Sequence, residues 1–191
     1  KWIDKGLLSP RVTINGVATR SAIRGQDALH KGIELEFNTK PNPNFDLGGI
    51  VSLGDWKWAN DVVGELRSDG DQTITTVNIY SGGLYVGNHP QTQMGLTARY
   101  QISKVFDIGG QYLYNAKLYS DYDVSDRDDP GASNFQPYQM DNYGVMDLRL
   151  GARFNLGNVG AYFMVQCYNL LDNIYWSRGI DAVSYTHLRA H

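Results

Sequence analysis

The 191-residue chain has little cysteine, little charge and no long apolar runs. Its single cysteine, Cys167, excludes an intramolecular disulfide and a zinc site built from several cysteines. No run of about eighteen apolar residues occurs, which excludes a membrane-spanning helix but not a membrane β-barrel, whose strands alternate in polarity. Charged residues make up only 19% of the chain, and its net charge of −3 argues against a general nucleic-acid-binding protein.

The short motifs of common catalytic and cofactor sites are also missing. The sequence contains no G-x-S-x-G, H-E-x-x-H, G-x-x-x-x-G-K-[ST] or G-x-G-x-x-G run. The motif that comes nearest is the calcium-binding loop of an EF-hand. Asp121, Asp123 and Ser125 stand at its first three ligand positions. Asp126 replaces the glycine of its turn and Ala132 replaces its bidentate glutamate, so an EF-hand is excluded. We therefore predict no enzymatic activity, no cofactor and no metal site.

The sequence does contain 21 glycines, 13 tyrosines and a repeated alternation of apolar and polar residues. Alternation with period two predicts β-strands, and no comparable helical period occurs. The alternating segments are residues 29–38, 45–54, 91–102, 106–118, 146–156 and 159–167.

Such strands fit either a soluble sandwich with its apolar face inside or a membrane barrel with its apolar face outside. The lengths of the connections favour the barrel, because short links (39–44, 103–104, 157–158) alternate strictly with long ones (4–27, 59–90, 119–142). In an antiparallel sheet this puts all short turns at one end and all long loops at the other, as in outer-membrane barrels. We predict an all-β fold, an antiparallel transmembrane β-barrel fragment with short periplasmic turns and long extracellular loops.

Three stretches resemble TonB-dependent outer-membrane receptors, in particular those of the Bacteroidetes. The run VQCYNLLDNIY (165–175) is similar to the N-L-F-D-K-x-Y signature near the C-terminus of these receptors, and DALHKGIELEFNTKP (27–41) is similar to their G-x-E-x-E barrel strand. The stretch SLGDWKWANDV (52–62), followed by GLYVGNHPQTQMGLTARY (83–100), resembles their barrel as well.

The resemblance implies the C-terminal portion of a large plugged barrel, of about 22 strands. Residues 1–183 would supply six full strands and part of a seventh, whereas residues 184–191 resemble a non-native tail. The implied function is uptake of a scarce nutrient complex (iron-siderophore, haem, cobalamin or glycan) across the Gram-negative outer membrane. The implied partners are outer-membrane lipid, a small-molecule or metal-chelate ligand, and the TonB complex, which acts through a plug and TonB box that we expect upstream; nucleic acid is not expected.

Two alternatives stay open from the sequence. One is a passive porin-like or structural outer-membrane barrel. The other is a soluble β-sandwich that binds carbohydrate through its tyrosines.

Two groups of candidate site residues follow from this interpretation. The first group lies in the acidic connection 119–142, whose net charge is −5. Three roles are open for this connection: a solvated external cap, a gate for the ligand, or a bridge through divalent cations to anionic lipid. The second group faces the lumen and contacts either a plug or a ligand. Trp56 and Trp58 are expected to be interfacial anchors. The candidate ligand-binding residues are Tyr119, Asp121, Tyr122, Asp123, Asp126, Arg99 and Arg149, and the candidate lumen or plug contacts are Glu34, Glu36, Asp147 and Arg153.

Overall fold

The computed structural model describes residues 2–3, 11–14, 17–69, 72–182 and 185–190, and this part of the chain is built from β-strands. The pairing is antiparallel everywhere except between β11 and β15. The prediction of an all-β, antiparallel fold is therefore confirmed. Among these residues no helix has the length and apolar character needed to cross a membrane.

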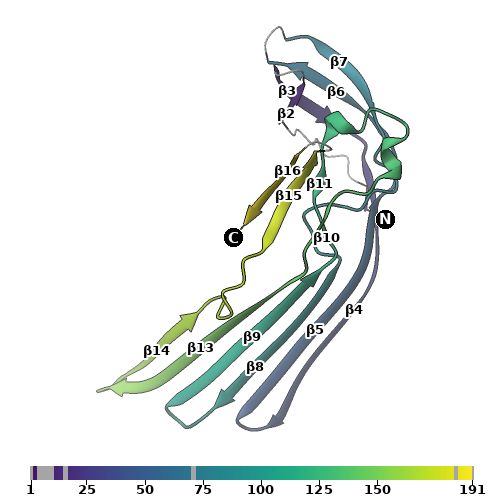
Figure 1. Cartoon of the computed structure of the whole chain (residues 1–191). Coiled ribbons are helices and arrows are strands. Elements are labelled where there is room, and N and C mark those ends of the chain that lie inside the picture. The colour runs from purple at the N-terminus through teal and green to yellow at the C-terminus, as the bar shows by residue number, and fades with distance from the viewer. Residues whose placement is uncertain (1, 4–10, 15–16, 70–71, 183–184, 191) are drawn as a thin grey trace.

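One long sheet of seven strands dominates the molecule (Figure 1). Its strand order is β1-β4-β5-β8-β9-β13-β14. The strands of this sheet therefore lie side by side in the order in which the chain reaches them, and the remaining elements are inserted between them in the sequence. The sheet has two ends rather than closing on itself within the described residues, since β1 pairs only with the start of β4 and β14 pairs only with β13. The strands are β1 (Trp2–Ile3), β4 (Asp27–Asn42), β5 (Phe45–Trp58), β8 (Thr92–Gln101), β9 (Phe106–Ala116), β13 (Tyr143–Leu156) and β14 (Val159–Cys167).

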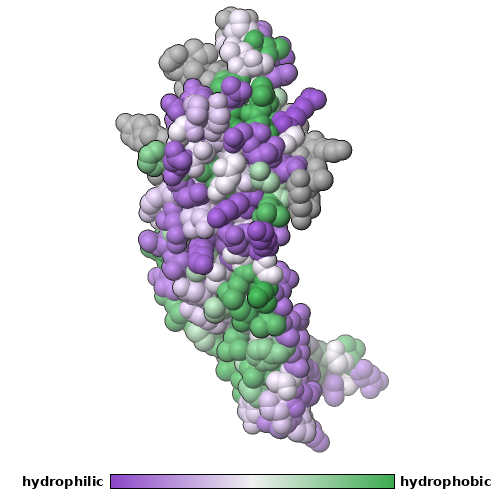
Figure 2. All heavy atoms as spheres, turned by 90° about the vertical axis from the view of Figure 1, so that its right-hand side faces the viewer, coloured by the Kyte–Doolittle hydropathy of each residue, from purple (hydrophilic) through white to green (hydrophobic). Residues whose placement is uncertain are grey.

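The register of this sheet keeps apolar side chains on one face. Leu35 lies opposite Val51, which lies opposite Met94, and the same parity continues through Tyr114 on β9. We call this surface the apolar face. In Figure 2 hydrophobic residues gather over the lower part of the molecule. The large exposed side chains of the apolar face include Ile33, Leu35, Phe37, Leu53, Met94, Leu96, Tyr100, Phe106, Tyr112, Leu150, Phe154, Leu156, Phe163 and Val165.

The short connections are tight turns at one end of the long sheet, as predicted. Two residues separate β4 from β5 and also β13 from β14, and four separate β8 from β9. In the β13–β14 turn Gly157 has a φ of 63°, a left-handed conformation that glycine adopts without steric cost. The hairpin register therefore runs without a shift from Leu156 opposite Val159 to Leu148 opposite Cys167.

The long connections are not plain loops, and this differs from the sequence-based expectation. They build a second sheet of order β2-β3-β6-β7 and several short pairings at the opposite end of the molecule (Figure 1). The elements of the long connections are β2 (Arg11–Ile14), β3 (Val17–Ile23), β6 (Val62–Ser68), β7 (Ile74–Ile79), β10 (Leu118–Tyr119), β11 (Asp121–Tyr122), β12 (Gln139–Met140) and the short 3₁₀ turns η1 (Val124–Asp126) and η2 (Ala132–Asn134). The segment after β14 adds β15 (Trp176–Ala182) and β16 (Tyr185–Ala190).

The best-buried apolar cluster lies at this loop end, where it includes the loop-end residues of two strands of the long sheet, Ala28 on β4 and Trp58 on β5. It joins four separate segments, and its members are Ile23, Ala28, Trp58, Val62, Ile79, Leu84, Tyr122 and Val124. Trp58 is only 8% exposed, so the expectation of an interfacial anchor at this position is wrong. Trp56 stacks on His30 with ring centroids 5.1 Å apart.

The C-terminal segment also forms a strand. Residues 185–190, expected to be part of a non-native tail, make up β16, which pairs antiparallel with β15. β15 in turn pairs with β11, so the segment belongs to a three-stranded sheet at the loop end. That the tail is non-native stays a prediction.

Candidate functional site

The six side chains predicted to share the lumen all lie on the face of the long sheet opposite the apolar face. We call this surface the polar face. Their register positions alternate with the apolar ones on each strand, which is the consequence of a side-chain period of two. They are Glu34 and Glu36 on β4, Arg99 on β8, and Asp147, Arg149 and Arg153 on β13. That this face lines a lumen stays a prediction.

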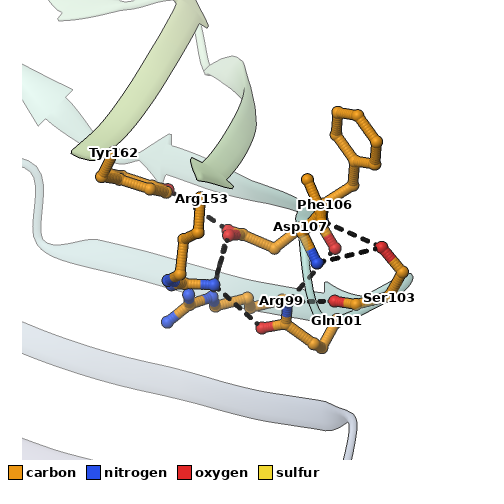
Figure 3. A network of polar contacts seen from close by, with 8 residues as sticks. Arg99, Gln101, Ser103, Phe106, Asp107, Arg153 and Tyr162 are labelled. Carbon is orange, nitrogen blue, oxygen red and sulfur yellow. Dashed lines mark hydrogen bonds and ion pairs between the residues drawn. The ribbon is translucent and has the colours of Figure 1, made fainter. Parts of the chain in front are cut away.

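The structure brings Arg99 and Arg153 together around a residue that the sequence analysis did not select, Asp107 (Figure 3). The Asp107 side chain is fully buried, with Oδ1 3.3 Å from Nε of Arg99 and Oδ2 3.0 Å from Nη1 of Arg153. Tyr162 donates from its hydroxyl to Oδ1 at 3.4 Å, and its ring lies under the Arg153 guanidinium at 5.0 Å. A buried carboxylate is stable only when it is paired, and the two guanidinium groups supply that pairing. Oδ2 relies on the ion pair with Arg153 and has no hydrogen bond to the described residues.

Hydrogen bonds connect the same cluster to the β8–β9 turn. Arg153 also donates to Oε1 of Gln101 at 3.2 Å, and Gln101 donates to the carbonyls of Ser103 and Phe106. The Ser103 hydroxyl accepts the backbone N–H groups of Val105 and Phe106, each at 3.1 Å. The short-turn end of the polar face is therefore a hydrogen-bonded unit.

Asp147 anchors the run that resembles the receptor signature. Its Oδ1 accepts the backbone N–H of Asn169 at 2.9 Å, and its Oδ2 accepts Nε2 of Gln111 at 2.7 Å. The Asn169 side chain then donates to the backbone carbonyl of Asn173 at 3.0 Å and accepts the backbone N–H of Asn173 at 3.2 Å. Tyr175 stacks on Tyr143 with centroids 4.1 Å apart. Residues 169–175 thus form a hook that folds back onto β13.

Arg99 and Arg149 line one groove of about 250 Å³ on the polar face. They flank Gly109 in a single row of the sheet, with Arg99 on β8 and Arg149 on β13. Glu34 and Glu36 on β4 do not line this groove and are exposed. Glu36 accepts a hydrogen bond from Asn38 at 3.0 Å, and Glu34 accepts one from Ser52 at 3.5 Å.

The candidate residues of the acidic connection lie at the loop end and do not join the polar-face cluster. Tyr119 is 8% exposed and stacks on Tyr85 with centroids 4.2 Å apart. Tyr122 is 7% exposed, packs edge-on against Trp58, and exchanges hydrogen bonds with the buried Gln26 at 2.7 and 3.0 Å. Burial raises the pKa of Tyr122 to about 12, against the opposing effect of Gln26. Both tyrosines therefore have protein partners, and a ligand would have to displace those partners to stack on them.

The aspartates of this connection serve partly as local caps. Asp123 starts η1 by accepting the backbone N–H of Ser125 at 2.9 Å and its hydroxyl at 2.7 Å. Asp126 ends the same turn. Burial raises the pKa of Asp121, although the Tyr122 N–H that it accepts opposes the shift.

Arg127 organises this connection, a role that its charge alone did not indicate. It is 3% exposed and donates to the carbonyls of Ala132 and Phe135, while its Nη2 lies 4.0 Å from Asp181 on β15. Burial lowers the pKa of Arg127, and the neighbouring carboxylates oppose that shift. The acidic connection is therefore folded around a buried cation, which differs from the expectation of a simple solvated cap.

No group of three or more His, Cys, Asp or Glu side chains within the described ranges is arranged to hold a metal ion. The candidate residues fall into two separate sets, a polar-face set built around arginines and a loop-end set that is largely packed. No protein-family model, curated protein or solved structure matches the chain in the comparisons made.

Proposed function

We propose that this chain forms part of the wall of a TonB-dependent outer-membrane transporter, which takes up a scarce nutrient complex. The observation that carries the proposal is the polarity of the long sheet. Within the described sheet the apolar face is exposed over six strands and carries charged side chains only toward the loop end, among them Lys31, Asp55 and Lys57. Nearer the short turns the charged side chains lie on the other face. This is the polarity of a membrane barrel wall, apolar toward lipid and polar toward a hydrated interior.

The exposed side chains argue against a soluble sandwich. Leu35 is 66% exposed, Phe163 60% and Leu156 66%, and they lie on different strands of one face. In a sandwich a second sheet would cover such residues at a spacing of about 10 Å. Contiguous apolar patches on soluble monomers rarely exceed a few hundred Å², and larger ones mark a membrane or protein contact.

The transport part of the proposal rests on the resemblance of residues 169–175 to the receptor signature. These residues have specific contacts with β13, because the backbone N–H of Asn169 donates to Asp147 and Tyr175 stacks on Tyr143. The proposed partners are outer-membrane lipid, a small-molecule or metal-chelate ligand, and the TonB complex, with the protein in the Gram-negative outer membrane. A passive porin-like barrel is the competing function.

Fractionation of cells that express the protein tests the location. We expect the protein to stay with outer membranes through a carbonate wash and to change its electrophoretic mobility on boiling, as folded membrane barrels do. Recovery from the aqueous fraction as a stable monomer would refute the proposal. Nutrient uptake that continues unchanged after deletion of the TonB gene would instead favour the passive barrel.

A further inference from the structure

We propose that Arg149 and Arg99 form a binding site for an oxyanion, a carboxylate or phosphate group of a small molecule, on the polar face. This inference goes beyond the proposed transport function and does not need it, because the site requires only that the polar face is in contact with water. It rests on the geometry around Gly109.

Gly109 makes room for Arg149 to lie across the sheet. A Cβ atom at position 109 would be 2.7 Å from Nε of Arg149 and 3.4 Å from its Cγ, so the arginine side chain passes directly over the glycine. Gly109 is paired with Arg149 on one side and with Arg99 on the other. The backbones of β8 and β13 are two strand spacings apart, about 10 Å, which brings the two long side chains over the same groove.

The Arg149 guanidinium has no ion pair or hydrogen bond to any residue that the structure describes. Arg99 pairs with Asp107 through Nε, so its terminal nitrogens are available to another acceptor. The groove is completed by the hydrogen-bonding side chains of Thr97, Gln111 and Gln166 and by the carboxylate of Asp147. Two guanidinium groups with further polar side chains around one groove match the geometry that recognises carboxylate and phosphate.

The local charge also favours an anion. Three arginines (Arg99, Arg149 and Arg153) face two aspartates (Asp107 and Asp147), which leaves a net charge of +1. Both oxygens of Asp147 already accept hydrogen bonds from Gln111 and Asn169. Asp46, which lies opposite Arg99 on β5, is paired with Lys40 at 3.2 Å. The positive charge of Arg149 is therefore the one left without a neutralising partner in this row.

Calorimetric titration of the protein in neutral detergent tests the site, with citrate and inorganic phosphate as probes in a buffer free of other oxyanions. We expect saturable binding of at least one probe, weakened by high salt, and the tighter probe identifies the class of ligand. In Arg149→Gln the affinity should fall about ten- to a hundredfold, the range for loss of a charged hydrogen-bonding partner. Arg149→Lys keeps the charge without the planar fork and should fall in between.

Two further variants separate a built site from a general charge effect. Gly109→Ala keeps every charge but displaces Arg149, so we expect weaker binding in a protein with unchanged circular dichroism. Arg67→Gln on β6 is the matched control, since it removes the same charge outside the groove and should leave the affinity unchanged. The proposal is overturned if neither probe binds, or if Arg67→Gln weakens binding as much as Arg149→Gln does.

Discussion

A pair of arginine substitutions at one depth of the sheet tests whether the apolar face contacts lipid. Met94 lies on the central strand β8, on the apolar face, and is 42% exposed. Ser52 lies on the neighbouring strand β5, one residue along from Val51, the partner of Met94, and faces the opposite side next to Glu34. The two positions therefore differ in face but hardly in depth.

An arginine on the lipid face near the bilayer midplane costs about 2 to 4 kcal/mol. Met94→Arg should thus lower the ratio of folded to unfolded protein by roughly 30- to 900-fold. Ser52→Arg should cost less than about 1 kcal/mol, because its guanidinium reaches water and the Glu34 carboxylate. The measurement is denaturant unfolding in lipid vesicles, followed by the fluorescence of the four tryptophans.

A third variant distinguishes a bilayer from a protein that covers the same face. Phe106 is 55% exposed on the apolar face but lies at the start of β9, beside a short turn. Near the interface the cost of arginine falls to about 0 to 1 kcal/mol, so Phe106→Arg should be much milder than Met94→Arg. Equal costs at Met94 and Ser52, or no dependence on depth, would refute the lipid-facing assignment.

Three further predictions concern the two polar clusters. Arg99→Ala and Arg153→Ala should each lower the free energy of unfolding by about 1 kcal/mol. The double variant should lower it by about 3 kcal/mol or more, because the buried Asp107 then has no cation beside it. Strictly additive costs of the two single variants would contradict this expectation. Tyr122→Phe, which removes a hydroxyl partner of the buried Gln26, should speed amide hydrogen exchange in residues 119–127, and unchanged exchange would refute the structural role. Since burial raises the pKa of Asp121, ionisation of its carboxyl group destabilises the fold progressively as the pH rises above the unfolded-state pKa of about 4, and the loss is complete above the folded-state pKa. Asp121→Asn should accordingly increase the protease resistance of the connection at pH 7, with no increase near pH 3 by hydrogen exchange, and a gain at both pH values would contradict the titration argument.

The strands of the long sheet could be predicted from the sequence because the alternation of apolar and polar residues is a local pattern. Each strand carries its own alternation, so the face of Leu35 or Leu150 follows from counting residues along one segment. The short turns were equally visible, since they interrupt the pattern for only a few residues. Which strands pair at the two open edges, and whether further strands close the sheet, is not contained in such a local pattern.

The structure of the loop end could not be predicted from such local patterns. Its core joins Ile23, Trp58, Ile79 and Tyr122, which come from four segments, and none of these four residues lies within an alternating stretch of the sequence. Trp58 ends β5 just beyond the alternating stretch 45–54 and was therefore expected at an interface. Only the packing of the long connections against one another buries it.

Asp107 shows why charge patterns along the sequence also fall short. The sequence placed Asp107 on the polar side of its strand, where a solvated carboxylate is the ordinary outcome. Its burial depends on Arg99 from the preceding strand and on Arg153 and Tyr162 from a hairpin about fifty residues later in the chain. Such a pairing becomes visible only once the register between β8, β9 and β13 is known.

The many glycines have a role that composition alone did not reveal. On the polar face large side chains lie flat over glycines of the neighbouring strand: Arg149 over Gly109, and Tyr162 over Gly151, where a Cβ atom would overlap the tyrosine ring. A glycine on one strand therefore sets the direction of a functional side chain on the next. Gly151 directs the Tyr162 hydroxyl to Asp107, and Gly109 directs Arg149 toward Arg99. In this sheet the positions without side chains determine where the charged groups converge, so Gly109 belongs to the proposed anion site as much as the arginines do.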